Sequence, residues 1–287
     1  MVISVIGLGL LGGSFALGLQ AKYQQPLRII GVDSNQEHAE EALSLRICDE
    51  ILPLNKAIPR SDLVVLATPV STIEQLLPTV LDRIQPDAVV TDLGSTKGNI
   101  CDAVVHHPNR KRYIAAHPIA GTEFSGPSSA FPGLLLHKIM ILCNTAQSDA
   151  VAVKRLEEIF AGLLQMNLQY MEAHEHDLHL AYVSHLSHAI SFALSNTVLD
   201  KEKDESSILA LAGSGFSSTV RLAKSSPEMW APIFLQNHRH MREALHAYIG
   251  YLQEFSRAIQ AGDETRLLSL MRQSNAIIKV LDRSPGE

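Results

Sequence analysis

The sequence contains few cysteines, no run of basic residues long enough to make a face, and no long hydrophobic stretch. Its three cysteines lie far apart and form no CxxC pair. This usage suits a reducing compartment such as the cytoplasm and argues against a metal held by sulfur. The apolar N-terminal run lacks a basic leader and is soon interrupted by glycines, which argues against a signal peptide or a membrane span. We therefore expect a cytoplasmic protein with no membrane partner.

Basic residues are also in the minority. The 287 residues carry 24 Lys and Arg against 30 Asp and Glu, a formal net charge of −6. Lysine and arginine are scattered singly apart from the short run at 110–112, so the chain offers no patch for a phosphate backbone. Nucleic acid is therefore not expected as a partner. The 46% hydrophobic content is enough to fill the cores of two domains of ordinary size.

A glycine-rich turn follows the first predicted strand. The apolar run 2–6 leads into the GxGxxG sequence at 7–12, a helical stretch follows over 14–22, and a second apolar run, 29–32, stops at Asp33. GxGxxG alone is a weak signal, but here it follows a strand, opens a helix and precedes an acid by about twenty residues. This context predicts a dinucleotide-binding βαβ unit.

Each part of this unit has a physical task. Gly7 allows the tight turn, Gly9 lets the backbone approach a pyrophosphate, and Gly12 lets the helix lie close to the strand. The pyrophosphate would rest on free N–H groups at the start of the helix, beside Leu10 and Leu11. The Asp33 carboxylate would accept hydrogen bonds from the ribose hydroxyls and repel a 2′-phosphate, which favours NAD over NADP.

Helices and strands alternate as far as residue 171. The patterns predict helices over 36–45, 71–84 and 149–162, and strands over 63–67, 88–92, 113–116, 138–142 and 167–171. Short apolar runs separated by helices are typical of a parallel sheet that is covered on both faces. We expect an α/β, Rossmann-type doubly wound domain over residues 1–171.

The remainder, 172–287, is predicted to be an all-helical domain. Three segments without β-like alternation, 173–202, 226–261 and 263–282, are predicted helices. The first is apolar on nearly all sides, which indicates burial against other helices or a second subunit. We expect a homodimer formed through this half. The charged run 201–205 is predicted to be a solvated loop between helices.

Ligands of open parallel sheets bind beyond the carboxyl ends of the strands. Thr68 and Pro69 follow one predicted strand and should pass close to the dinucleotide. Ser95 follows another strand, and His117 a third. Imidazole is the side chain whose unperturbed pKa lies nearest neutrality, so His117 is the candidate base of a dehydrogenase, with Ser95 or Thr96 to orient it. The alternative for His117 is a structural hydrogen-bonding role.

The helical half contributes a histidine-rich stretch. His176 and His179 share a helical face, as do His185 and His188, so a metal site is one alternative. No further ligand set with metalloenzyme spacing accompanies them, and alcohol oxidation by NAD needs no metal; we predict none. Further on come a flexible loop at Gly213, then Arg221, then Trp230. A loop, an arginine and an aromatic ring are suited to binding a planar substrate that carries a carboxylate. A surface ion pair is the alternative for Arg221.

Taken together, these residues resemble the prephenate dehydrogenase family of tyrosine biosynthesis. The resemblance runs over nearly the whole chain and rests on the glycine turn with Asp33, 92–97, 117–123, 184–188 and 221–230. It implies an N-terminal NAD-binding domain and a helical domain for substrate binding and dimerisation, with the active site between them. The implied reaction is the NAD-dependent oxidative decarboxylation of prephenate to 4-hydroxyphenylpyruvate and CO2.

The resemblance also implies residue roles. His117 would be the catalytic histidine that contacts the ring hydroxyl, Ser95 would orient it, and Arg221 would bind the ring carboxylate. Further substrate contacts, or the loop that closes over them, would come from Thr122, Glu123, Ser184, His185, His188, Gly213 and Trp230.

Three alternatives remain open. Arogenate dehydrogenase is one, although His188 favours prephenate. The β-hydroxyacid dehydrogenases are disfavoured, because no lysine stands between 172 and 200 where their catalytic lysine is expected. A non-catalytic NAD-sensing regulator would need only the glycine fingerprint, without Ser95, His117, His188 and Arg221.

Overall fold

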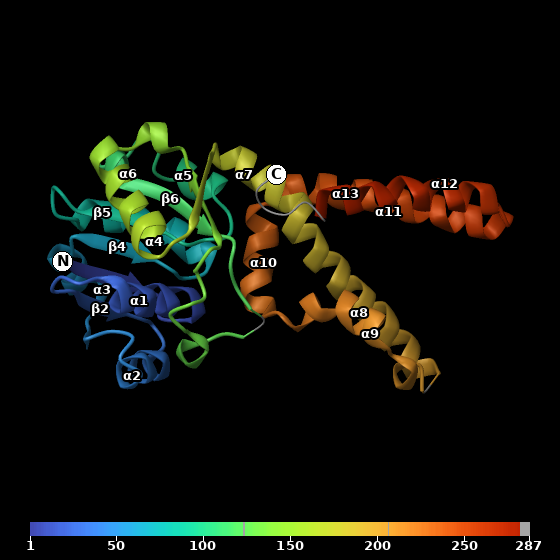
Figure 1. The fold of residues 1–287 in the computed structure, drawn as a ribbon, viewed down its shortest axis with the longest axis horizontal. Coiled ribbons are helices and arrows are strands. Elements are labelled where there is room, and N and C mark those ends of the chain that lie inside the picture. The colour runs from blue at the N-terminus through green and yellow to red at the C-terminus, as the bar shows by residue number, and fades with distance from the viewer. Residues whose placement is uncertain (123, 206, 282–287) are drawn as a thin grey trace. The chain divides into compact units, whose positions relative to one another are not determined.

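An eight-stranded sheet organises the first part of the chain (Figure 1). The computed structural model describes residues 1–122, 124–205 and 207–281. The strand order is β3-β2-β1-β4-β5-β6-β7-β8, and all neighbours are parallel except β6 and β7. The strands are β1 (Val2–Ile6), β2 (Arg28–Val32), β3 (Glu50–Ile51), β4 (Leu63–Leu66), β5 (Val89–Asp92), β6 (Tyr113–Pro118), β7 (Ile139–Cys143) and β8 (Asn167–Met171).

The antiparallel β6–β7 pair departs from the parallel sheet that the sequence pattern predicts. A parallel connection needs a crossover long enough to return to the starting edge, usually with a helix. The segment between β6 and β7 has no α-helix in its described residues, and its one regular turn is the 3₁₀ turn Pro127–Ser129. The chain therefore enters β7 from the edge at which β6 ends.

Helices cover both faces of the sheet. Alternate strand side chains enter two separate hydrophobic clusters, so Leu63 and Val65 lie in one and Val64 and Leu66 in the other. The helices of the sheet-bearing part are α1 (Leu10–Lys22), α2 (Gln36–Ser44), α3 (Leu54–Ala57), α4 (Val70–Arg83), α5 (Gly98–Asp102) and α6 (Ala150–Glu157). Side chains of α1 and α6 enter the first cluster and those of α4 and α5 the second, which confirms the doubly wound architecture.

The helical half begins with one long, interrupted helix. It comprises α7 (Ala173–Leu180), a π-helical turn (Ala181–His185) and α8 (Leu186–Asp204). The prediction of a loop at 201–205 is wrong, because α8 continues to Asp204. Pairs between Lys203 and Asp200 at 2.7 Å and between Lys201 and Glu205 at 3.7 Å join opposite charges one helical turn apart, which favours an exposed helix.

The second predicted helix is divided. It consists of α10 (Pro227–Gln236) and α11 (His238–Ala261), separated at Asn237, and short α9 (Ser214–Thr219) precedes it. The chain forms two compact units, Met1–His238 and Arg239–Glu287. The first unit extends past residue 171 because Leu180, Trp230 and Ile233 share a hydrophobic cluster with the sheet. The domain division after residue 171 stays a prediction.

The second unit is helical in its described residues. It contains α11 from Arg239 onward, α12 (Glu264–Ser274) and α13 (Ile278–Leu281). Gly262, with a positive φ of 63°, ends α11, and the Asp263 carboxylate accepts a hydrogen bond from Arg266 N at 2.9 Å to cap α12. No helix in the described part of the chain is both long and apolar enough to cross a membrane.

The glycine turn supplies a matched pair of stability variants. A Cβ at Gly12 would lie 2.0 Å from the carbonyl oxygen of Gly7, whereas a Cβ at Gly9 would meet nothing within 4 Å. We expect Gly12→Ala to lower the free energy of unfolding by at least ~1–3 kcal/mol, the range typical of overpacking, because the backbone must move. Gly9→Ala should lose at most about 1 kcal/mol, the cost of a poorer N-cap. Urea unfolding of both variants measures this; equal losses would contradict the close approach at Gly12.

Candidate functional site

The glycine turn lies where the strand order reverses, between the carboxyl ends of β1 and β4. Gly7 has a φ of +95°, and a Cβ there would lie 2.6 Å from the Ala67 carbonyl oxygen, so the turn requires glycine. Gly9 is the N-cap of α1 and has no side chain to cap the free N–H groups. Leu10 and Leu11 form the half-buried first turn of this helix. Free N–H groups at a helix start with open space above Gly9 fit a pyrophosphate.

Asp33 lies at the end of β2, held by the backbone. Its Oδ2 accepts a hydrogen bond from Leu8 N at 2.9 Å and its Oδ1 one from Asn35 N at 2.9 Å. Each carboxylate oxygen has a second lone pair for a ribose hydroxyl. These bonds join the acid to the glycine turn, so the geometry suits the role that the sequence predicts for it.

Thr68 and Pro69 face the same turn from the end of β4. The Thr68 methyl group would lie 3.0 Å from a Cβ on Gly7, and Thr68 Oγ1 is buried without a hydrogen-bond partner among the described residues. Pro69 is exposed and forms the N-cap of α4. An unpartnered buried hydroxyl beside the glycine turn is the arrangement expected at a polar ligand site. The residues present therefore fit a dinucleotide.

His117 lies near the end of β6, at the same edge of the sheet. Its Nδ1 is 2.8 Å from Nε2 of His176, and Nδ1 of His176 is 2.8 Å from Oδ1 of Asp177. All three side chains are buried, His176 completely. Burial, followed by the influence of His176, Lys97 and His185, holds the pKa of His117 well below its usual value of 6.5. At neutral pH the imidazole is therefore uncharged and able to accept a proton.

Sequence reasoning missed this chain of hydrogen bonds. The sequence pattern offers His176 only as a possible metal ligand and predicts no role for Asp177. Adjacent residues on a helix normally point in different directions, so spacing alone gave no signal that both serve one chain. Ser95 is half-buried, and no hydrogen bond within the described residues joins it to His117; its orienting role stays a prediction.

A buried ion pair supports the strand ends beneath His117. Lys97 Nζ donates to Asp92 Oδ2, and both side chains have no exposed surface. Lys97 Nζ also donates to the Ala116 carbonyl at 3.0 Å, and the Tyr113 hydroxyl donates to Asp92 Oδ1 at 2.7 Å. This network joins the turn after β5 to β6 immediately before His117. The sequence predicted the turn as a site but gave no indication of its buried charges.

The helical half brings His185, His188 and Trp230 together. His188 stacks on Trp230 with 3.5 Å between ring centroids, and His185 meets the same indole edge to face at 5.8 Å. Asn237 Nδ2 donates to His185 Nδ1 at 3.1 Å and to the Asp177 carbonyl at 2.7 Å. Burial lowers the pKa of His185 to about 4. The Asn237 contacts thus connect this aromatic cluster to the His117 chain.

The remaining predicted substrate contacts vary. The Ser184 carbonyl accepts a hydrogen bond from His188 Nδ1 at 3.0 Å. Arg221 is exposed and forms no ion pair within the described residues. Burial is the main cause of the lowered pKa of His188, and the nearby charge of Arg221 lowers that pKa further. Thr122 and Gly213 are exposed and contact none of these side chains through a hydrogen bond in the described part of the chain. Glu123 lies outside the described residues.

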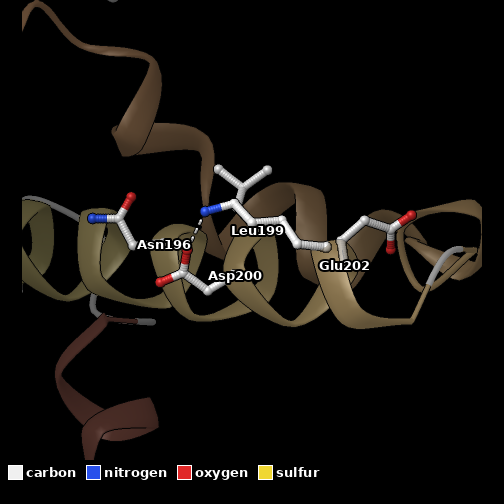
Figure 2. A pocket seen from close by; sticks show the side chains of 5 residues that line it. Asn196, Leu199, Asp200 and Glu202 are labelled. Atoms are coloured by element: carbon white, nitrogen blue, oxygen red, sulfur yellow. Dashed lines mark hydrogen bonds and ion pairs between the residues drawn. The ribbon is translucent and has the colours of Figure 1, made fainter.

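Two other features do not form part of this arrangement. Among the residues that the structure describes, no group of three or more His, Cys, Asp or Glu side chains is placed to hold a metal ion. A surface depression lies on the C-terminal half of α8 (Figure 2), where Lys203 pairs with Asp200. Its lining comes from this one helix, and it contains none of the predicted site residues.

Known proteins match the chain over both halves. The nucleotide-binding domain of prephenate dehydrogenase matches residues 15–165, and the dimerization domain of prephenate dehydrogenase matches 172–273. Prephenate dehydrogenase of Bacillus subtilis is 30% identical over 92% of this chain and 72% of its own. Prephenate dehydrogenase of Aquifex aeolicus, solved with hydroxyphenyl propionate and NAD+, has 30% identity and a TM-score of 0.88, with 98% of each chain covered.

A second similar structure has a different substrate in its name. Synechocystis arogenate dehydrogenase is 26% identical with a TM-score of 0.73, and covers 98% of this chain and all of its own. A glycine turn at the switch point of the sheet and a buried imidazole at the same edge define a dinucleotide-dependent oxidoreductase. With the matches to both domains, the chain belongs to the prephenate dehydrogenase family.

The Asp33 geometry predicts the cofactor preference. Asp33→Asn removes the charge that would repel a 2′-phosphate while keeping one side-chain oxygen as an acceptor. We expect the ratio of kcat/KM for NAD to that for NADP to fall at least about tenfold, which corresponds to about 1.4 kcal/mol. Steady-state kinetics with both dinucleotides measures the ratio. Asn35→Ala, which leaves the carboxylate in place, is the control, and an unchanged ratio in Asp33→Asn would contradict the role of Asp33.

Proposed function

We propose that this protein catalyses the NAD-dependent oxidative decarboxylation of prephenate, with His117 as the catalytic base. The observation that carries the proposal is the setting of His117, at the edge of the sheet where the glycine turn lies. Its Nδ1 is held by His176, while its Nε2 makes no hydrogen bond within the described residues. The family membership and the similarity to the Aquifex enzyme support the same activity.

The chemistry needs one acceptor for a proton and one for a hydride. Prephenate is a cyclohexadienol whose quaternary carbon carries a carboxylate. NAD, held by the glycine turn and Asp33, would supply the acceptor for the hydride that leaves the ring carbon bearing the hydroxyl. His117 Nε2 accepts the hydroxyl proton as the hydride leaves the same ring carbon. The electron pair of the bond between ring and carboxylate then makes the ring aromatic, CO2 leaves, and His117 returns the proton to the phenolate oxygen. Aromatisation makes the step effectively irreversible and gives 4-hydroxyphenylpyruvate.

Arg221 is assigned to the ring carboxylate. A guanidinium pairs with a carboxylate through two parallel hydrogen bonds, which fixes orientation as well as position. Because an ion pair to the departing carboxylate also stabilises the ground state, the benefit of Arg221 lies in positioning the substrate. The stacked rings of His188 and Trp230 and the Ser184–His185 turn line the other end. Thr122, Glu123 and Gly213 are kept as predicted contacts of the surrounding loops.

The choice between prephenate and arogenate rests on that other end. The two substrates differ only in a keto group against an amino group, and we assign prephenate on the basis of His188. Arogenate is the second candidate, favoured by the similarity to the Synechocystis enzyme. The NAD-sensing alternative has less support, because a sensor does not need the buried His117–His176–Asp177 chain.

The assembly and location follow the same reasoning. We place the division between the NAD-binding and helical domains after residue 171, in agreement with the two family matches. The dimerization-domain match supports a homodimer through the helical half, as do exposed apolar side chains on its first long helix, such as Tyr182, Val183 and Leu199. We propose a cytoplasmic location, in keeping with three free, buried cysteines.

The test of the proposed function is turnover with each substrate. Purified protein should reduce NAD when given prephenate, and release of CO2 should match NADH formed. We expect kcat/KM for prephenate to exceed that for arogenate, because the side-chain keto group meets His188. A preference for arogenate would contradict the assignment of His188. In that case His188→Asn should leave the ratio of kcat/KM for the two substrates unchanged. Absence of turnover with either compound would contradict the enzyme itself.

The roles of His117 and Arg221 predict opposite kinetic signatures. His117→Ala should lower kcat at least about 100-fold with a modest change in KM, because general-base catalysis is lost. Arg221→Ala should chiefly raise KM, because it removes binding and positioning. Arg83→Ala, which removes an exposed arginine from the last turn of α4, is the matched control for loss of positive charge. Full kcat in His117→Ala would contradict the base assignment.

A further inference from the structure

A buried carboxylate ends the hydrogen-bond chain that begins at His117. Asp177 Oδ1 lies 2.8 Å from His176 Nδ1, and His176 Nε2 lies 2.8 Å from His117 Nδ1. The Asp177 side chain also accepts hydrogen bonds from Lys97 N at 2.7 Å and Gly98 N at 2.8 Å. Hydrogen bonds from backbone N–H groups stabilise an ionised carboxylate. The pKa of Asp177 is lowered, since these bonds and His176 together outweigh burial.

The ionised carboxylate determines which nitrogen of each ring carries hydrogen. Because Asp177 can only accept, His176 must donate to it from Nδ1. Neutral His176 then presents a lone pair on Nε2, and His117 must donate to that lone pair from Nδ1. Nε2 of His117 is left as the acceptor. We propose that Asp177 and His176 are positioning residues that hold His117 in the tautomer whose Nε2 can take a proton.

This inference rests on the proposed role of His117 and extends it to two residues that do not touch the substrate. Burial keeps His176 neutral, because it lowers the pKa of this imidazole despite the neighbouring carboxylate. When His117 gains a proton at Nε2, its Nδ1–H still has an acceptor, and the positive charge lies in line with Asp177. Asp177 therefore stabilises the imidazolium without itself being protonated, as the aspartate of a Ser-His-Asp triad does.

The same carboxylate fixes the position of the chain as well as its protonation. Lys97 N and Gly98 N belong to the turn after β5 and the start of α5, whereas His176 and Asp177 belong to α7. A Cβ at Gly98 would lie 2.9 Å from Asp177 Oδ2, so the close approach requires glycine there. The contact keeps the histidine pair at a set distance from the strand that carries His117.

Variants of His176 separate the relay from simple packing. His176→Gln keeps an acceptor oxygen near the former Nε2, so His117 retains its tautomer although the link to Asp177 is lost. His176→Leu fills similar volume and offers no acceptor. We expect kcat to fall at least about tenfold in His176→Leu and to stay within about threefold of wild type in His176→Gln, each with little change in KM. Equal losses in the two variants would overturn the relay.

Asp177→Asn tests the tautomer directly. Asp177 Oδ1 accepts hydrogen bonds from both His176 Nδ1 and Lys97 N. An amide nitrogen in the position of Oδ1 donates to His176 Nδ1 instead, which reverses both rings and places hydrogen on His117 Nε2. We expect kcat to fall at least about 100-fold while prephenate KM changes little, since a wrong tautomer is more damaging than a missing partner. Nitrogen-15 NMR of histidine-labelled protein, with His117→Asn used to assign the signals, should show Nε2 of His117 unprotonated in wild type and protonated in Asp177→Asn. An unchanged His117 signal would overturn the inference.

Gln236→Leu is the matched control for loss of a polar contact between the same two parts of the chain. Gln236 bonds Thr96 at 2.5 Å and Glu74 at 2.8 Å, beside the relay but not in it. Its removal should lower Tm while leaving the His117 signal at its wild-type position. If His117→Asn keeps turnover, the base assignment fails. If His117→Asn loses turnover while Asp177→Asn keeps wild-type kcat and tautomer, the relay alone fails.

Discussion

The arrangement of the candidate site depends on the hydrogen bonds that the Asp177 carboxylate accepts. This carboxylate accepts two backbone hydrogen bonds from the turn after β5 and a third hydrogen bond from His176 on α7. A buried carboxylate without such partners would be strongly disfavoured. Its ionised form therefore persists only while the turn and α7 stay in register. The same contact that joins helix to sheet sets the hydrogen bonding of His117, so local stability and proton transfer are coupled here.

Two buried polar networks lie next to each other at this edge of the sheet. The Lys97–Asp92 pair fixes the strand ends, and the backbone of Lys97 contributes to the Asp177 site. Buried ion pairs do not by themselves make a protein more stable than a well-packed apolar core would. Geometry explains why the pair is present here. With an apolar side chain in place of Asp92, no partner would direct Lys97 Nζ to the carbonyl of Ala116, the residue immediately before His117.

Sequence reasoning predicted local features well and contacts between distant segments poorly. The glycine turn, Asp33 and seven of the eight strands are recognisable because each signal lies within a short stretch of sequence. The exception is β3, which has only two residues, Glu50–Ile51, and so shows no periodicity. The antiparallel direction of β7 follows from the absence of a crossover helix before it, and the π-helical turn at Ala181–His185 depends on packing around the site. Neither has a signal in the local sequence pattern. His176 and Asp177 stand in a stretch of histidines and acids, where periodicity cannot distinguish a solvated side chain from a buried one.

The π-helical turn links this limitation to the chemistry. A π turn adds a residue to a helix and rotates the side chains that follow, and such turns occur frequently at functional sites. Here the turn lies between His176 of α7, which contacts His117, and His188 of α8. Continuous α-helical geometry would give His185 and His188 a different angle relative to His176. The extra residue thus allows one helical segment to contact both the proposed base and Trp230, the two ends of the proposed substrate site.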